Sequence, residues 1–201
     1  MTRAGWRSRG YLPHFDAPDL VQHIVFRLAD SLPAHLIEGI ASTSRHECLD
    51  AADAALDCGH GRGDLALPQI ARTIEETMLR FDGDRYALIA WCVMPNHVHA
   101  LIETRMGHRL DRVLHSWKSF TAHFANRFLG RTGRFWAPEY FDRFMPDDTQ
   151  LGKTVAYIEA NPPPGCAEIR PNGPSPRPGA GSRGRVARGP KRVGNSGSPL
   201  R

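Results

Sequence analysis

The sequence lacks any long run of apolar residues. A membrane-spanning helix needs about 20 consecutive, mostly apolar residues, and a secretory signal needs an apolar stretch after its basic start. The N-terminal segment MTRAGWRSRG is basic, but no such stretch follows it. These absences argue against a membrane protein and a secreted one, and we therefore expect a cytoplasmic protein.

Cysteine is scarce and irregularly spaced. The four cysteines, at Cys48, Cys58, Cys92 and Cys166, form no CxxC pair, so in a reducing compartment we expect free thiols. An alternative is a structural zinc site built from His46, Cys48, Cys58 and His60, although neither pair has a standard structural-zinc spacing.

The positive charge is concentrated at one end of the chain. Residues 163–201 hold eight Lys or Arg and one acid, which is +7, so the net charge of +5 leaves residues 1–162 at −2. This tail is also rich in Gly, Pro and Ser, a composition typical of disorder. We expect one folded domain over residues 1–162, with 41% hydrophobic residues in the whole chain to build its core, and a disordered tail over 163–201. A phosphate-binding surface on the domain would have to be a local patch.

Apolar periodicity and turn residues outline the domain. Strands are predicted at Val21–Leu28 and within 133–145, a short helix near Leu36–Ile40, and helices over Ala51–Leu56, Pro68–Phe81, Leu110–Leu129 and from Asp147 to Asn161. The 110–129 helix has an apolar stripe that should be core: Leu110, Val113, Leu114, Trp117, Phe120, Phe124 and Phe128. Its other side is basic and includes Arg112 and Lys118, as either a solvated face or a phosphate contact.

The segment YALIAWCVMPNHVHALIET, residues 86–104, reads as a β-hairpin. Two apolar runs flank the turn signal Pro95-Asn96. Successive side chains of a strand point to opposite sides, so His97 and His99 share a face. Two neutral imidazoles on one face could hold a divalent metal with one more ligand. The alternative is a surface pair of histidines at a strand end.

The last predicted helix carries Lys153, Tyr157 and Asn161 at intervals of four residues, which would place them on one stripe. An asparagine before proline is also an ordinary helix end.

The motif Trp91-Cys92-Val93-Met94-Pro95-Asn96-His97-Val98-His99, followed by Tyr157-Ile158-Glu159-Ala160-Asn161-Pro162, resembles the REP-associated tyrosine transposases of the IS200-like family. Further similarity lies at Trp117-Lys118-Ser119-Phe120, at Phe135-Trp136 and at Tyr140-Phe141-Asp142-Arg143. The resemblance covers roughly residues 10–162.

The resemblance implies an α+β fold, with an antiparallel sheet and helices on one face in a ferredoxin-like arrangement. It implies a metal-dependent transposase and endonuclease that cleaves and rejoins single-stranded DNA through a 5′-phosphotyrosine intermediate. Tyr157 would be the nucleophile, and His97, His99 and Asn161 would hold Mg²⁺ or Mn²⁺. The DNA partner would be a hairpin-forming repeat, and the protein a monomer or homodimer, associated with the nucleoid when bound to DNA.

Four basic residues are candidates for DNA contact: Arg112, Lys118, Arg143 and Lys153. Lys118 has the strongest case, because the family carries a lysine there.

The sequence departs from the family after Pro162. Codons for Pro164–Gly179 can be chosen so that the neighbouring frame reads AGLCRDPAEWPFSSAR, which resembles what the family has at this point. We therefore hypothesise a frameshift near the codons for residues 162–164, which would leave the predicted site residues intact but remove a segment that packs against the tyrosine helix.

The rival function is a catalytically inactive DNA- or RNA-binding remnant of the same fold.

Overall fold

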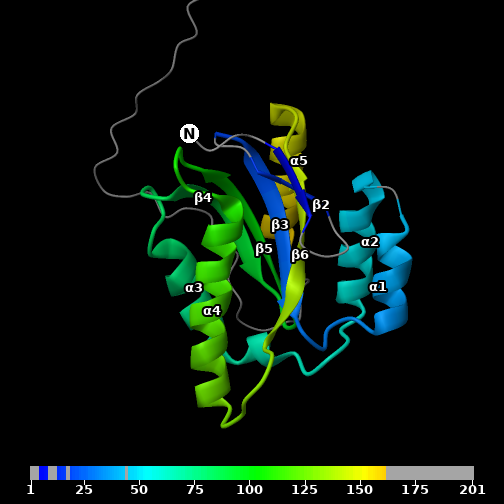
Figure 1. The fold of residues 1–201 in the computed structure, drawn as a ribbon, viewed down its shortest axis with the longest axis vertical. Coiled ribbons are helices and arrows are strands. Elements are labelled where there is room, and N and C mark those ends of the chain that lie inside the picture. Colours follow the sequence, from blue (N-terminus) through cyan, green and yellow to red (C-terminus); the bar gives the residue numbers. More distant parts are fainter. Residues whose placement is uncertain (1–4, 9–12, 17–18, 44, 162–201) are drawn as a thin grey trace, which may run out of the picture.

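A four-stranded antiparallel sheet forms the centre of the molecule (Figure 1). The computed structural model describes residues 5–8, 13–16, 19–43 and 45–161. The sheet has the order β4-β5-β3-β6 and consists of β3 (Val21–Leu28), β4 (Tyr86–Val93), β5 (His97–Thr104) and β6 (Trp136–Phe144). Two short strands, β1 (Gly5–Ser8) and β2 (Pro13–Asp16), pair with each other in a separate sheet.

The helices lie where the apolar periodicity predicts them. They are α1 (Ala34–Ala41), α2 (Arg45–Asp57), α3 (Pro68–Leu79), α4 (Leu110–Phe128) and α5 (Asp148–Ala160), with a 3₁₀ turn η1 (Asp64–Ala66) before α3. Pro68 stands at the start of α3, where its missing N–H costs nothing. The Asp147 carboxylate accepts from the Gln150 backbone N–H and caps the start of α5.

The connections give a ferredoxin-like topology. Strand β3 leads through α3 to β4 at the sheet edge, and the β4–β5 hairpin returns the chain beside β3. Helix α4 then connects β5 to β6 on the other side of β3. The predicted α+β class, the antiparallel sheet and the ferredoxin-like order are therefore confirmed.

One face of the sheet packs against α3 and α4. Its core includes Phe26 from β3, Ile74 from α3 and Trp117 from α4, which are all at most 2% exposed. Val98 and Ala100 of β5 belong to this core, so the alternate residues His97 and His99 point to the other face.

The expectation of helices on one face only is wrong, because α1, α2 and α5 cover the second face (Figure 1). Val25 and Phe141 of the sheet pack with Leu49 and Leu56 of α2. Farther along the same face, Ile158 of α5 packs with Cys92 of β4. The strands read as nearly continuous apolar runs for this reason, since both faces are buried.

The predicted apolar stripe of α4 is also partly wrong. Leu110, Val113, Leu114 and Trp117 are buried as expected, but Phe120 is 57% exposed and Phe128 is 48% exposed. The buried face continues through Thr121 and Ala125, which follow Trp117 at steps of four residues. Small side chains there let the helix approach the sheet, and the larger phenylalanines are left outside.

The tail predicted at 163–201 and the end of the 1–162 domain lie outside the described residues. Among the helices that the structure describes, none has the length and apolar character to cross a membrane.

The buried tyrosine at the start of β4 links three elements of the core. The Trp117 indole N–H donates to the Tyr86 hydroxyl at 3.0 Å, and that hydroxyl donates to the Met78 carbonyl at 2.5 Å. Tyr86→Phe leaves the buried indole N–H and the carbonyl without this partner. We expect a loss of about 1–3 kcal/mol in the free energy of unfolding, measured by urea denaturation. The exposed-site control Phe120→Leu should change it by less than about 0.5 kcal/mol, and an equal effect of both variants would contradict this account.

Candidate active site

His97 and His99 lie together on the second face of the sheet, as the hairpin predicts. Their Nε2 atoms are 2.9 Å apart, and the two residues are 1% and 0% exposed. The alternative of a surface pair is therefore wrong.

The turn before them fixes the orientation of His97. The Asn96 side-chain NH₂ donates to the carbonyls of Leu56 at 3.0 Å and His60 at 3.2 Å. Since carbonyls only accept, the Asn96 amide oxygen must face His97, where it lies 2.7 Å from Nδ1. His97 Nδ1 therefore carries the proton that it donates, and His97 Nε2 presents a lone pair to His99.

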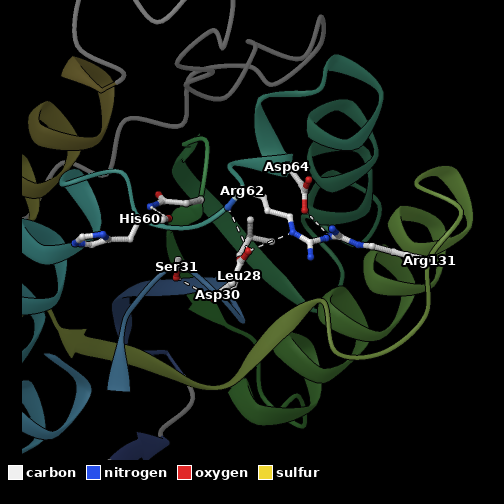
Figure 2. A network of polar contacts seen from close by, with 8 residues as sticks. Leu28, Asp30, Ser31, His60, Arg62, Asp64 and Arg131 are labelled. Atoms are coloured by element: carbon white, nitrogen blue, oxygen red, sulfur yellow. Dashed lines mark hydrogen bonds and ion pairs between the residues drawn. The ribbon is translucent and has the colours of Figure 1, made fainter. Parts of the chain in front are cut away.

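The loop after α2, whose His60 carbonyl accepts a hydrogen bond from the Asn96 amide, is held in place by contacts of its own (Figure 2). The Arg62 backbone N–H donates to the Asp30 carboxylate at 3.2 Å, and Arg131 forms an ion pair with Asp64. Gly61 has φ +88°, and a Cβ there would come within 2.8 Å of the Asp30 carbonyl oxygen. The loop needs a glycine at this point, where the chain crosses close to the end of β3.

A third histidine, which the sequence did not identify as part of the site, completes the group. His23 of β3 lies opposite Leu101 in the sheet and places its Nε2 3.1 Å from Nδ1 of His99. We call His23, His97 and His99 the histidine cluster. The clue in the sequence was a histidine inside the apolar strand VQHIVFRL, which the structure buries to 3% exposure.

All three imidazoles are neutral at neutral pH. Burial lowers the pKa of His99 to about 4. Burial, followed by repulsion from His99 and His23, lowers the pKa of His97 well below its usual range. For His23, burial, then His99 and then Arg143 lower the pKa in the same way. Neutral imidazoles keep the lone pairs that a metal ion requires.

Tyr157 of α5 stands against this cluster. Its ring centroid is 5.6 Å from that of His99 and 6.4 Å from that of His23, and the residue is 38% exposed. Its hydroxyl donates to Asp53 Oδ2 of α2 at 3.4 Å. Burial, then the carboxylates of Asp53 and Asp57, raise the pKa of the phenol.

Asn161 ends α5 instead of continuing its stripe. Its backbone leaves the helix with φ −92° and ψ 144°, and its Nδ2 donates to the Tyr157 carbonyl at 3.1 Å. The amide oxygen is then the atom that Asn161 could offer to a cation. A hydrogen bond from the Asn161 side chain also lowers the Tyr157 pKa, against the larger raising effects.

A cleft of about 410 Å³ opens between α2 and α5 beside the cluster. We call it the tyrosine cleft, and its lining includes His23, Asp50, Asp53, Arg143, Lys153 and Tyr157. Asp53 was not predicted from the sequence. Burial, then the neighbouring carboxylates of Asp57 and Asp50, raise its pKa to about 7.

The four candidate DNA contacts separate into two pairs. Arg143 and Lys153 line the tyrosine cleft, where Arg143 Nη2 pairs with Asp50 at 2.9 Å. Arg112 and Lys118 lie on α4, across the sheet from the histidines. The Lys118 ammonium donates to the carbonyls of Ala137 at 2.6 Å and Pro138 at 3.0 Å, and burial lowers its pKa to about 8. DNA contact by any of the four stays a prediction.

The donor set of the hairpin fits a divalent cation. Two lone pairs 2.9 Å apart repel each other, so either the His99 Nε2 proton or a cation lies between His97 and His99. Ligands at about 2.1 Å from one ion and at a right angle are about 3.0 Å apart, close to this separation. His23 is hydrogen bonded to the far nitrogen of His99 and does not converge on the same point.

The alternative zinc site is not supported. Within the described part of the chain, no three His, Cys, Asp or Glu side chains are placed to hold a metal ion, and Cys48, Cys58 and His60 belong to that part. The Cys58 thiol donates to the Ala54 carbonyl of its own helix. The side chain of His46 lies outside the described residues.

The sequence and the structure were compared with known proteins in three ways. The family model described as an IS200-like transposase matches residues 67–161, from the start of α3 to the end of α5. No protein with a curated description matches the sequence. The match covers Tyr157, the two predicted histidine ligands and Asn161, and leaves His23 and Asp53 outside.

Two solved structures resemble the fold. A REP-associated tyrosine transposase bound to a REP hairpin matches at 12% identity over 74% of this chain and 70% of that one, with a TM-score of 0.49. A candidate transposase from Deinococcus radiodurans R1 matches at 16% identity over 76% of this chain and 95% of that one, with a TM-score of 0.39.

The buried histidines predict a loss of stability in acid. An unfolded chain takes up a proton on His99 near pH 6.5, but the folded chain does so only near pH 4. Unfolding between these values is accompanied by proton uptake, so this contribution to stability falls as the pH falls. Asp53 acts in the opposite direction, since its raised pKa means that the folded state holds more protons below about pH 7.

The contribution of His99 to stability is therefore measured as the difference in pH dependence between the parent and His99→Gln. Between about pH 7 and about pH 5, the chelator-treated parent should lose about 2 kcal/mol more unfolding free energy than His99→Gln. Urea denaturation at both pH values gives the numbers, and His115→Gln, at an exposed histidine, controls for loss of an imidazole. Equal pH dependence of the parent and His99→Gln would contradict the buried neutral cluster.

Proposed function

Because residues 67–161 match the family model of the IS200-like transposases, we propose that the chain cleaves and rejoins single-stranded DNA by transesterification, with Tyr157 as the nucleophile. The observation that carries the proposal is the position of Tyr157, a partly exposed phenol whose ring lies 5.6 Å from that of the buried, neutral His99. The alternating pattern of the hairpin and the register of α5 bring these residues together from distant parts of the chain.

The chemistry suits a tyrosine. A phenol oxygen attacks phosphorus and displaces the DNA 3′ oxygen, which leaves a 5′-phosphotyrosine link and a free 3′-hydroxyl. A phenol is also a competent leaving group, because its ordinary pKa is near 10, so a 3′-hydroxyl can reverse the step and rejoin DNA. Cleavage and joining therefore need one nucleophile and no external energy source.

The proposed metal would bind beside the β4–β5 hairpin, at the start of β5. His97, His99 and the amide oxygen of Asn161 would hold Mg²⁺ or Mn²⁺, which would neutralise charge on the non-bridging phosphate oxygens. The side-chain amide oxygen of Asn96 keeps the His97 Nε2 lone pair directed toward His99, and so keeps the two histidines ready to bind a cation.

Two cations of the chain could hold the phosphate at the tyrosine. Lys153 lies one helical turn before Tyr157 on α5, and Arg143 lies opposite His23 in the sheet. Both line the cleft, and they offset part of the negative charge that the carboxylates of α2 place there. Hairpin-forming repeats are the substrate class that the family resemblance suggests.

Covalent trapping tests the nucleophile. The protein is incubated with labelled single-stranded DNA hairpins and Mn²⁺, and a denaturant-stable adduct is sought by gel electrophoresis. We expect an adduct with the parent chain, none with Tyr157→Phe, and none after chelation. The matched control Tyr140→Phe removes a hydroxyl from β6, where the ring stacks on His14 at 4.0 Å, and should still form the adduct.

A different result would change the functional conclusion. Folded parent protein that binds the hairpins, equally well with and without the Tyr157 hydroxyl, and gives no adduct on a broad panel would indicate the inactive DNA-binding remnant. An adduct that survives Tyr157→Phe would assign the nucleophile elsewhere.

A further inference from the structure

We propose that Asp53 is a second catalytic residue, the carboxylate that takes the proton from the Tyr157 hydroxyl as this oxygen attacks DNA. The inference rests on the function proposed above and extends the site to α2, outside the range that the family model matches.

The amphipathic pattern of α2 presents Asp53 to the tyrosine. Leu49, Ala52 and Leu56 are buried against the second face of the sheet. Asp53 follows Ala52 and lies at the border of this apolar face, only 7% exposed, where the cleft separates α2 from α5. A helix packed so closely on a sheet holds the carboxylate in a fixed position.

The proton has a defined path. The Tyr157 hydroxyl donates its single proton to Asp53 Oδ2 at 3.4 Å. Hydrogen bonds of catalytic groups are often long before substrate binds and shorten in the complex. The acceptor is therefore already paired with the oxygen that would attack.

The surroundings of Asp53 favour uptake of this proton. Its other oxygen, Oδ1, is buried and has no hydrogen-bond partner among the described residues. Burying an incompletely paired carboxylate is costly, and protonation removes the charge. Asp50 and Asp57 of α2 add negative charge nearby, while Arg143 of β6 opposes them.

Other groups of the cleft act on the same carboxylate. Lys153 lines the cleft from α5 and His23 lines it from β3, and burial keeps His23 neutral at neutral pH. A DNA phosphate entering the cleft brings further negative charge, which raises the proton affinity of Asp53. At a pH that leaves Asp53 ionised, bound substrate therefore makes it a stronger base toward the Tyr157 hydroxyl.

The step balances without an added reagent. The Tyr157 O–H bond breaks and its proton moves to Asp53, while the phenol oxygen forms a bond to phosphorus. The bond from phosphorus to the DNA 3′ oxygen breaks, and that oxygen keeps the electron pair and takes a proton from water. In the reverse step a 3′-hydroxyl gives its proton back to water and bonds to phosphorus, the bond from phosphorus to the Tyr157 oxygen breaks, and Asp53 returns its proton to the phenol.

The decisive variant is Asp53→Asn, which has the shape of the protonated side chain and cannot accept the proton. Single-turnover adduct formation is measured against pH with a labelled hairpin that the parent cleaves. The parent rate should rise with pH through a midpoint near pH 7, the pKa of Asp53, to a plateau at higher pH, and Asp53→Asn should be slower by roughly 10²- to 10⁴-fold on that plateau. The affinity of the variant for the DNA hairpin should not weaken, because the substitution removes negative charge from the tyrosine cleft.

The pH profile separates catalysis from a structural role. In Asp53→Asn the rate should keep rising with pH where the parent rate has levelled off, because only spontaneous ionisation of Tyr157 then supplies the phenolate. Asp57→Asn removes the same charge from an exposed position of the same helix and should move the midpoint to lower pH while keeping the plateau. A variant that was merely misfolded would lose rate equally at every pH and would lose affinity.

The failures of the two proposals are distinguishable. If Asp53→Asn forms the adduct within about threefold of the parent rate and with the parent's pH profile, while Tyr157→Phe forms none, the role of Asp53 is wrong and the transposase chemistry stands. If the folded parent forms no adduct on the hairpin panel, the proposed function fails, and the role of Asp53 fails with it.

Discussion

The orientation of the Asn96 side chain is the constraint on which the rest of the site depends. Its two N–H groups are used by the Leu56 and His60 carbonyls, so its oxygen can face only His97. That contact decides which nitrogen of His97 carries the proton and directs the other nitrogen toward His99. His99 then donates from Nε2 and accepts from His23 at Nδ1, so a single amide sets the direction of hydrogen bonding through all three rings.

The same Asn96 amide connects the two histidines proposed to hold the metal to the helix that carries Asp53. The carbonyl of Leu56 belongs to α2, one turn after Asp53. The helix that presents the carboxylate to Tyr157 is therefore also the helix that orients the turn before His97. Burial is the shared physical cause on both sides, because it keeps the imidazoles neutral and makes the aspartate ready to hold a proton.

Local patterns were enough to predict the hairpin, the helices and the shared face of His97 and His99, because each depends on residues close in the sequence. His23 and Asp53 required information that periodicity does not contain. A histidine in an apolar strand and an aspartate on a helix both have ordinary explanations until the tertiary packing brings them to Tyr157. The second helical layer was missed for a related reason, since a strand buried on both faces reads much like one that is simply hydrophobic.

The exposure of Phe120 and Phe128 shows that an apolar stripe at helical spacing does not by itself tell which of its residues are buried. The stripe predicts which side of α4 is apolar, but the width of the contact is set by how closely α4 approaches the sheet. Thr121 and Ala125 allow a close approach, so the small residues are buried and the large ones are left at the rim.

Helix α5 packs on the sheet through a small apolar cluster of its own, with Leu151, Val155 and Ile158 against β4 and β5. The larger core that holds α3 and α4 lies on the opposite face. Because stability is uneven within a protein, a helix held by a small cluster can unfold locally at a lower free energy than the central sheet. Such an opening would withdraw Tyr157, the proposed nucleophile, while the histidine cluster stays assembled, so the proposed activity could be lost without loss of the fold.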